Sequence, residues 1–159
     1  MRIHSLIISA TTICALVVAL AVIAPAADHH VGTWKLDLAK SKFNSGPAPK
    51  REIATFAAQE NGLKLVVDGI DDKGKAYHVE YSARFDGKDY PVKGFTDADT
   101  IALNRIDAHA FYELFKKAGK GVESARLVVS NDGKTLTRTT DGKNAKGQAV
   151  SDIEVYDKK

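Results

Sequence analysis

The chain has 159 residues, a length typical of one domain, and carries 23 basic and 20 acidic side chains, for a formal net charge of +3. The basic residues are scattered among the acidic ones, which argues against the clustered Lys and Arg stripe of a nucleic-acid-binding surface. The single cysteine, Cys14, excludes a fold held together by intrachain disulfides.

Residues 1–26 have the order of a secretory signal peptide. Arg2 supplies a positive charge, an uncharged apolar run follows, and Ala24-Pro25-Ala26 provides small residues for cleavage. We predict cleavage between Ala26 and Ala27, and therefore a secreted or periplasmic protein. The apolar run is nearly long enough to span a bilayer, so the alternative is an uncleaved N-terminal anchor, the only contact with a membrane that we expect.

The rest of the chain, residues 27–159, is predicted to be one domain that begins with a strand at 33–38. Trp34 and Leu36 alternate with Lys35 and Asp37, a period of two that is typical of a half-buried strand. The Trp ring is the largest apolar side chain available, and its N–H still requires an acceptor. We predict that this single Trp closes one end of a β-barrel.

The segment SKFNSGPAPK follows, at residues 41–50, and it is the only loop that combines Pro, Gly and Ser. A segment of this length and composition is typical of an Ω-like loop, and we expect it to lie over one mouth of the barrel.

Short strands and tight turns fill the remaining chain. The strongest alternation runs from Tyr77 to Phe85, where every second residue is aromatic or apolar. Segment 109–117 is ambiguous, because Phe111, Leu114 and Phe115 also have helical spacing. The expected strands are 33–38, 51–58, 63–69, 75–85, 88–92, 100–106, 109–117, 122–130, 134–141 and 148–156.

Dipeptides that contain Gly lie between many of these strands. Such dipeptides form tight hairpin turns, because they tolerate the positive φ that these turns require. They are Asn61-Gly62, Asp68-Gly69, Lys73-Gly74, Asp86-Gly87, Asp132-Gly133, Asp141-Gly142 and Lys146-Gly147. Strands of this length at this spacing predict an all-β protein, an antiparallel up-and-down barrel of about eight to ten strands.

Two short motifs carry a family resemblance. Gly32-Thr33-Trp34-Lys35 resembles the signature that opens the first strand of lipocalins and fatty-acid-binding proteins, both calycin barrels. Val155-Tyr156-Asp157-Lys158 is similar to the end of fatty-acid-binding proteins. The longer string GTWKLDLAKSKF, at residues 32–43, also resembles a group of small secreted bacterial proteins without an assigned role.

The resemblance implies roles for several residues. Gly32 would leave room for the chain to enter the barrel, and a late-strand Arg would stack over Trp34, with Arg126 preferred to Arg138. Fatty-acid-binding proteins place an Arg two residues before the terminal Tyr to hold a carboxylate, but Glu154 occupies that position here. A buried Glu would repel a carboxylate, so this mode of ligand binding is not expected.

The inward-facing set of such a barrel supplies the candidate ligand-binding residues. It contains Phe56, Tyr77, Val79, Tyr81 and Phe111, whose apolar bodies and hydroxyl groups suit an amphipathic ligand. The alternative is that the same side chains fill the interior as ordinary core.

A metal site is predicted only at the new N-terminus. Cleavage after Ala26 or Ala27 would place His29 or His30 third from a free amine, where amine, amides and imidazole can chelate Cu(II) or Ni(II). A weaker metal-ligand set is His78, Glu80 and His109.

No cofactor is predicted, and no enzyme, because the chain lacks a Gly-x-Ser-x-Gly elbow, a phosphate loop and a His-Glu-x-x-His motif. The sequence thus predicts a barrel that binds or carries a small hydrophobic or amphipathic molecule. The alternative function is a protein-binding barrel with a filled interior, such as an envelope or protease-inhibitor module.

Overall fold

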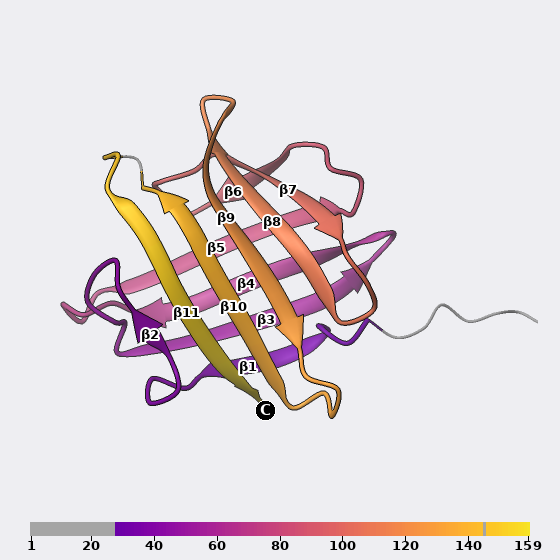
Figure 1. Ribbon diagram of the computed structural model, residues 1–159, viewed down its shortest axis with the longest axis horizontal. Helices are drawn as coiled ribbons and strands as arrows, with labels where there is room; N and C mark the ends of the chain where they lie inside the picture. The colour runs from indigo at the N-terminus through magenta and orange to yellow at the C-terminus, as the bar shows by residue number, and fades with distance from the viewer. Residues whose placement is uncertain (1–27, 145) are drawn as a thin grey trace, which may run out of the picture.

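The computed structural model describes residues 28–144 and 146–159, which fold into strands, turns and loops (Figure 1). The predicted leader, residues 1–26, lies outside the described residues, so its cleavage stays a prediction. Within the described part of the chain, no helix is long and apolar enough to cross a membrane.

The described residues form eleven strands, ten of which match the strands expected from the sequence. They are β1 (Gly32–Leu36), β2 (Lys42–Phe43), β3 (Arg51–Gln59), β4 (Gly62–Ile70), β5 (Ala76–Arg84), β6 (Tyr90–Lys93), β7 (Thr100–Arg105), β8 (Ala110–Lys117), β9 (Lys120–Val129), β10 (Thr135–Lys143) and β11 (Ala149–Lys158).

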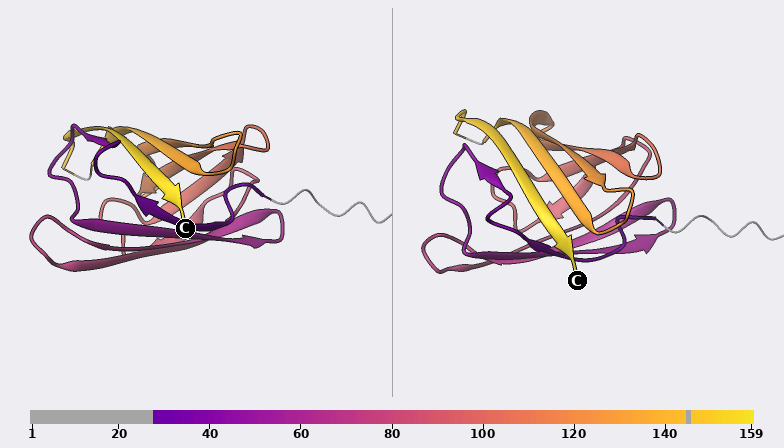
Figure 2. Two further views of the ribbon diagram at one scale, coloured as in Figure 1. Left: turned by 90° about the horizontal axis from the view of Figure 1, so that it is seen from below. Right: turned by 60° about the horizontal axis from the view of Figure 1, so that its bottom comes forward.

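The strands pair antiparallel in an up-and-down order that closes on itself. From β3 to β11 each strand pairs with the next, β3 pairs with β1, and β1 returns to pair with β11 through Trp34–Lys158 and Leu36–Tyr156. Ten strands therefore form the ring, which confirms the predicted antiparallel up-and-down barrel. β3, β4 and β5 cross behind β8 to β11 in Figure 1, and Figure 2 shows the two curved layers that enclose the interior.

The ambiguous segment is a strand. In β8, Phe111, Glu113 and Phe115 are buried, whereas Tyr112 and Leu114 are 46% and 36% exposed. The helical interpretation grouped Leu114 with the two Phe residues, but Leu114 points to the opposite face of the sheet. Period two explains all five positions, because successive side chains of a strand alternate between faces.

Two of the predicted turn dipeptides lie inside strands instead. Gly69 is within β4 and Gly142 within β10. A Cβ on Gly69 would lie 2.1 Å from the Tyr77 ring, and one on Gly142 would lie 2.3 Å from the Val122 carbonyl oxygen. Both positions require Gly because atoms of the neighbouring strand approach closely, and not because the chain turns there. The dipeptide alone does not distinguish these two reasons.

One end of the barrel is closed by packed side chains around Trp34. The Trp34 ring is fully buried, and its Nε1 donates a hydrogen bond to the His30 carbonyl oxygen at 2.8 Å. The His30 ring is also fully buried and packs edge-to-face on Phe111 and Phe56, with centroid distances of 4.6 and 6.4 Å. The residues just before β1 therefore fold under the barrel and satisfy the indole N–H.

The cation over Trp34 is Lys158, and the expectation of Arg126 is wrong. Lys158 Nζ lies 4.9 Å from the Trp34 ring centroid. Arg126 alternates with the buried Ala125 and Leu127 on β9, so it faces outward and is exposed. Gly32 has φ of +136°, and a Cβ there would lie 2.9 Å from the Lys158 side chain.

Candidate ligand-binding cavity

A cavity of about 710 Å³ opens at the end of the barrel opposite to Trp34. This volume lies within the range of small-molecule sites. The loop after β2, the β4–β5 turn, the β6–β7 loop and the β10–β11 turn all contribute residues to its mouth. Its deeper wall is apolar and consists of Ala54, Phe56, Leu65, Val67, Val79, Phe115, Leu127 and Leu136.

The structure places four of the five predicted ligand-binding residues on this cavity. Phe56, Tyr77, Val79 and Tyr81 line it. Phe111 belongs to the closed end, where its ring packs on Phe56 and Phe85 at centroid distances of 6.3 and 5.4 Å. Phe111 is therefore a core residue. It is the next inward-facing position on β8 after Glu113, and it lies beyond the end of the cavity.

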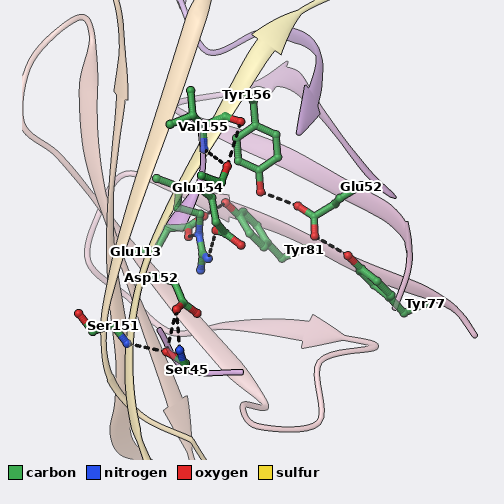
Figure 3. Close-up of polar contacts among 12 residues, drawn as sticks. Ser45, Glu52, Tyr77, Tyr81, Glu113, Ser151, Asp152, Glu154, Val155 and Tyr156 are labelled. Carbon is green, nitrogen blue, oxygen red and sulfur yellow. Dashed lines mark hydrogen bonds and ion pairs between the residues drawn. The ribbon is translucent and has the colours of Figure 1, made fainter. Parts of the chain in front are cut away.

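The first polar cluster of the cavity centres on Glu52 of β3. Tyr77 and Tyr156 each donate a hydroxyl hydrogen bond to a different Glu52 oxygen at 2.5 Å (Figure 3). Gly69 pairs with Glu52 on one side and Tyr77 on the other, so its missing side chain lets the Tyr77 ring reach across β4.

Burial governs the pKa values in this cluster. It raises the pKa of Glu52, and the Glu154 carboxylate raises it further, against the hydrogen bonds from Tyr156 and Tyr77. Burial, followed by the Glu52 carboxylate, also raises the pKa of Tyr77. The two phenols therefore stay protonated and act as donors.

The second polar cluster centres on Arg138 of β10. Its Nε donates to Glu113 at 3.2 Å, and its Nη1 donates to Glu154 at 2.8 Å. The Tyr81 hydroxyl donates to the other Glu113 oxygen at 2.5 Å (Figure 3). Arg138 pairs directly with Glu154 in the β10–β11 ladder, so the two side chains lie on the same face of the sheet.

Glu123 and Thr140 complete the polar lining, and neither side chain makes a hydrogen bond among the described residues. Glu123 is 6% exposed and makes no hydrogen bond or ion pair there. The Thr140 hydroxyl is buried with no hydrogen-bond partner. Burial raises the pKa of Glu123, and the nearby Arg138 only partly opposes this effect.

The cavity has a charge opposite to that of the whole chain. Its described lining contains seven carboxyl groups and two basic groups, although basic residues outnumber acidic ones in the full sequence. The acids are Glu52, Asp71, Asp97, Glu113, Glu123, Asp152 and Glu154, and the bases are Lys75 and Arg138.

The segment after β1 borders the mouth, as the loop composition predicted. Asp37 N and the Ser41 hydroxyl bond to Val155 backbone groups, so the segment follows the edge of β11. Asp152 then accepts hydrogen bonds from the Asn44 amide at 2.7 Å and from the Ser45 amide and hydroxyl at 3.0 and 2.9 Å. β2 itself is the strand that sequence reasoning missed.

The predicted metal ligands are engaged in other contacts. His29 stacks on His109 with ring centroids 4.0 Å apart, and the buried His30 Nδ1 lies 2.9 Å from Asp28. The N-terminal chelate depends on cleavage near Ala27, which lies outside the described residues, and it stays a prediction.

The second predicted set of metal ligands is also engaged in other contacts. His78 pairs with Asp68 at 2.7 Å and Glu80 with Lys93 at 2.9 Å. Among the described residues, no three His, Cys, Asp or Glu side chains form a group suited to a metal ion.

The sequence analysis did not identify the inward-facing charges of the cavity. Glu113 stands between Phe111 and Phe115 on an inward face, and Arg138 stands between Leu136 and Thr140 in the same way. A charged residue at an inward position of an alternating strand is the signal that marks them.

Comparisons with known proteins add a similarity to solved structures. No protein-family model matches the chain, and no curated protein sequence matches it. Among solved structures, the chain is similar to the crystal structure of zebrafish ileal bile acid-binding protein complexed with cholic acid, at 8% identity and a TM-score of 0.48. The match covers 82% of this chain and 99% of that one. At this level of similarity it carries no argument about the ligand of the present chain.

Proposed function

We propose that this protein binds a small amphipathic molecule inside its barrel and carries or stores it. The observation that supports the proposal is the cavity of about 710 Å³, which reaches from an open mouth to an apolar wall. A protein-binding barrel with a filled interior, the alternative from the sequence, has no need of such a space.

The distribution of side chains supports an amphipathic ligand and not a purely apolar one. Apolar side chains such as Leu65 and Leu127 line the deep part of the cavity, and the rest of the lining includes three tyrosines and nine charged side chains. A ligand with an apolar chain and a polar head matches both parts. Its chain would pack against the apolar wall, and its head would keep hydrogen-bond partners, so no polar group would lose water without a replacement.

Binding of N-phenyl-1-naphthylamine, a neutral lipophile that fluoresces in apolar surroundings, tests the proposal. We expect saturable binding to the purified domain, weakened about tenfold, or ~1.4 kcal/mol, when Val67→Phe narrows the cavity. Val66→Phe is the matched control, because Val66 neighbours Val67 but does not line the cavity. Absence of binding, or equal loss with both variants, would overturn the proposal.

We further propose that the barrel acts outside the cytoplasm, on the basis of the signal-peptide pattern in residues 1–26. N-terminal sequencing of the protein purified from its own host tests this. A start at Ala27 is the expected result, and a retained Met1 would favour the uncleaved anchor.

A further inference from the structure

The balance of charge in the cavity bears on the head group of the proposed ligand. Arg138, the only Arg in the described lining, already faces two carboxylates, Glu113 and Glu154. Glu52 has two tyrosine donors but no basic partner within ion-pair distance among the described residues. An anionic head group would enter a space where carboxyl groups outnumber the single guanidinium, and this arrangement is repulsive.

A second observation is independent of that charge count. Thr140 is 2% exposed and lines the cavity, and its hydroxyl has no hydrogen-bond partner among the described residues. Buried polar groups are satisfied in most proteins, so an orphaned hydroxyl on a cavity wall indicates a missing partner.

Glu123 also lines the cavity and makes no side-chain hydrogen bond among the described residues, and it lies next to Thr140. In the β9–β10 ladder Thr140 pairs with Ala125 and Glu123 pairs with Gly142, which puts Glu123 and Thr140 diagonally adjacent on the inward face. Gly142 has no side chain between them. A carboxylate and a hydroxyl oxygen both accept hydrogen bonds, so together they form an acceptor pair for one donor-rich group.

We propose that the ligand is a cationic amphiphile, whose ammonium or guanidinium head group binds Glu123 and Thr140 and whose apolar chain extends along the deep wall. This inference rests on the proposed function and specifies its ligand class. A cation supplies hydrogen-bond donors to both groups, and it places in direct contact with Glu123 a countercharge that Arg138, which forms its ion pairs with Glu113 and Glu154, provides only in part. Charge-assisted hydrogen bonds of this kind are the stronger ones.

Three ligands with the same ten-carbon chain test the head group: decylamine as its ammonium ion, decanol and decanoate. Each is titrated at pH 7 in competition with N-phenyl-1-naphthylamine. We expect decylammonium to bind at least about tenfold more tightly than decanol, and decanoate to bind more weakly than decanol.

Variants then locate the head group. Glu123→Gln is expected to remove most of the preference for decylammonium over decanol, and Thr140→Val to weaken decylammonium by several-fold. Glu80→Gln, on the outer face beside Lys93, is the matched control and leaves the preference unchanged. Thermal unfolding of each variant verifies that it is folded.

The outcomes separate the two proposals. If none of the three decyl ligands and no naphthylamine binds, the proposed function fails. If decanol binds but decanoate equals or exceeds decylammonium, the function stands and the cationic ligand is wrong. The cationic ligand is also wrong if folded Glu123→Gln and Glu80→Gln variants keep equal preferences for decylammonium.

Discussion

At the scale of single residues, Arg138 is the side chain that joins the charged groups of the cavity. It is the cation between Glu113 and Glu154, and the Tyr81 hydroxyl extends the same network. The two carboxylates raise the pKa of Arg138 against the effect of burial, which alone would lower it. The guanidinium therefore stays charged, and it allows two glutamates to remain inside the barrel.

We expect Arg138→Ala to destabilise the protein by about 3 kcal/mol, because it leaves the buried Glu113 and the partly buried Glu154 without a countercharge. Urea unfolding followed by circular dichroism measures this change. Arg126→Ala is the control, since Arg126 is exposed on the outer face of β9, and such a change typically costs within about 0.5 kcal/mol. Similar losses for the two variants would contradict the role assigned to the Arg138 network.

At the scale of elements, the segment from Ser41 to Pro47 is held against β11 mainly by side chains. β2 contributes only two paired residues, and the Asp152 carboxylate accepts three hydrogen bonds from Asn44 and Ser45. Because Phe43 and Pro47 also line the cavity, this segment forms part of its entrance.

We expect Asp152→Ala to release this segment and to speed both entry and exit of N-phenyl-1-naphthylamine. Stopped-flow fluorescence measures the two rates, and hydrogen exchange of the Asn44 and Ser45 amides reports the release directly. Asp152→Asn is the matched control, because its amide oxygen still accepts hydrogen bonds, and its effect should be smaller. Unchanged amide exchange in Asp152→Ala would show that the segment does not depend on this carboxylate.

The elements also show which features the sequence could predict. Alternation and the spacing of turn residues identified the ten strands of the ring, since both are local properties of the sequence. β2 was not predicted, because its two residues, Lys42 and Phe43, are too few to show an alternating pattern. The Asp68-Gly69 dipeptide was assigned to a turn, because Gly is common both in turns and where two chain segments approach closely. Only the pairing of Glu52, Gly69 and Tyr77 across three strands shows that this Gly makes room for a side chain.

At the scale of the whole molecule, the cavity residues were predictable only in part. Tyr77, Val79 and Tyr81 follow from one alternating strand. The ion-pair network requires the register of β8, β10 and β11, which bring Glu113, Arg138 and Glu154 together, and a single sequence does not fix such register. The Arg126 assignment was wrong because Arg126 lies on the outward face of β9, between the inward-facing Ala125 and Leu127.

The stability of the whole protein is expected to depend on pH through two acids that line the cavity, Glu52 and Glu123. The folded pKa values of Glu52 and Glu123 are raised above the ordinary value of about 4.3. Between that value and the raised ones, the unfolded chain loses protons that the folded chain keeps. The free energy of unfolding therefore falls as pH rises through this window.

Thermal unfolding between pH 5 and pH 8 measures this effect, and we expect a lower melting temperature at pH 8. Glu52 faces Tyr77 and Tyr156, with Glu154 and Arg138 nearby, and Glu123 faces Arg138, Asp97, Asp152 and Glu154. The double variant Glu52→Gln and Glu123→Gln should flatten the profile and raise the melting temperature at pH 8. Glu60→Gln at an exposed turn is the control, and an equal flattening in that variant would contradict the assignment.

Closure of the ring by β1 and β11 also has a consequence for biogenesis. These two strands stand near opposite ends of the described chain, so the seam through Trp34 and Lys158 is a pairing of very high contact order. A ribosome delivers β11 last, and until it arrives the nascent polypeptide has neither Glu154 nor Tyr156 to complete the polar clusters. The cavity is therefore complete only after β11 has been synthesised, and until then the apolar wall of the barrel lacks one of its sides.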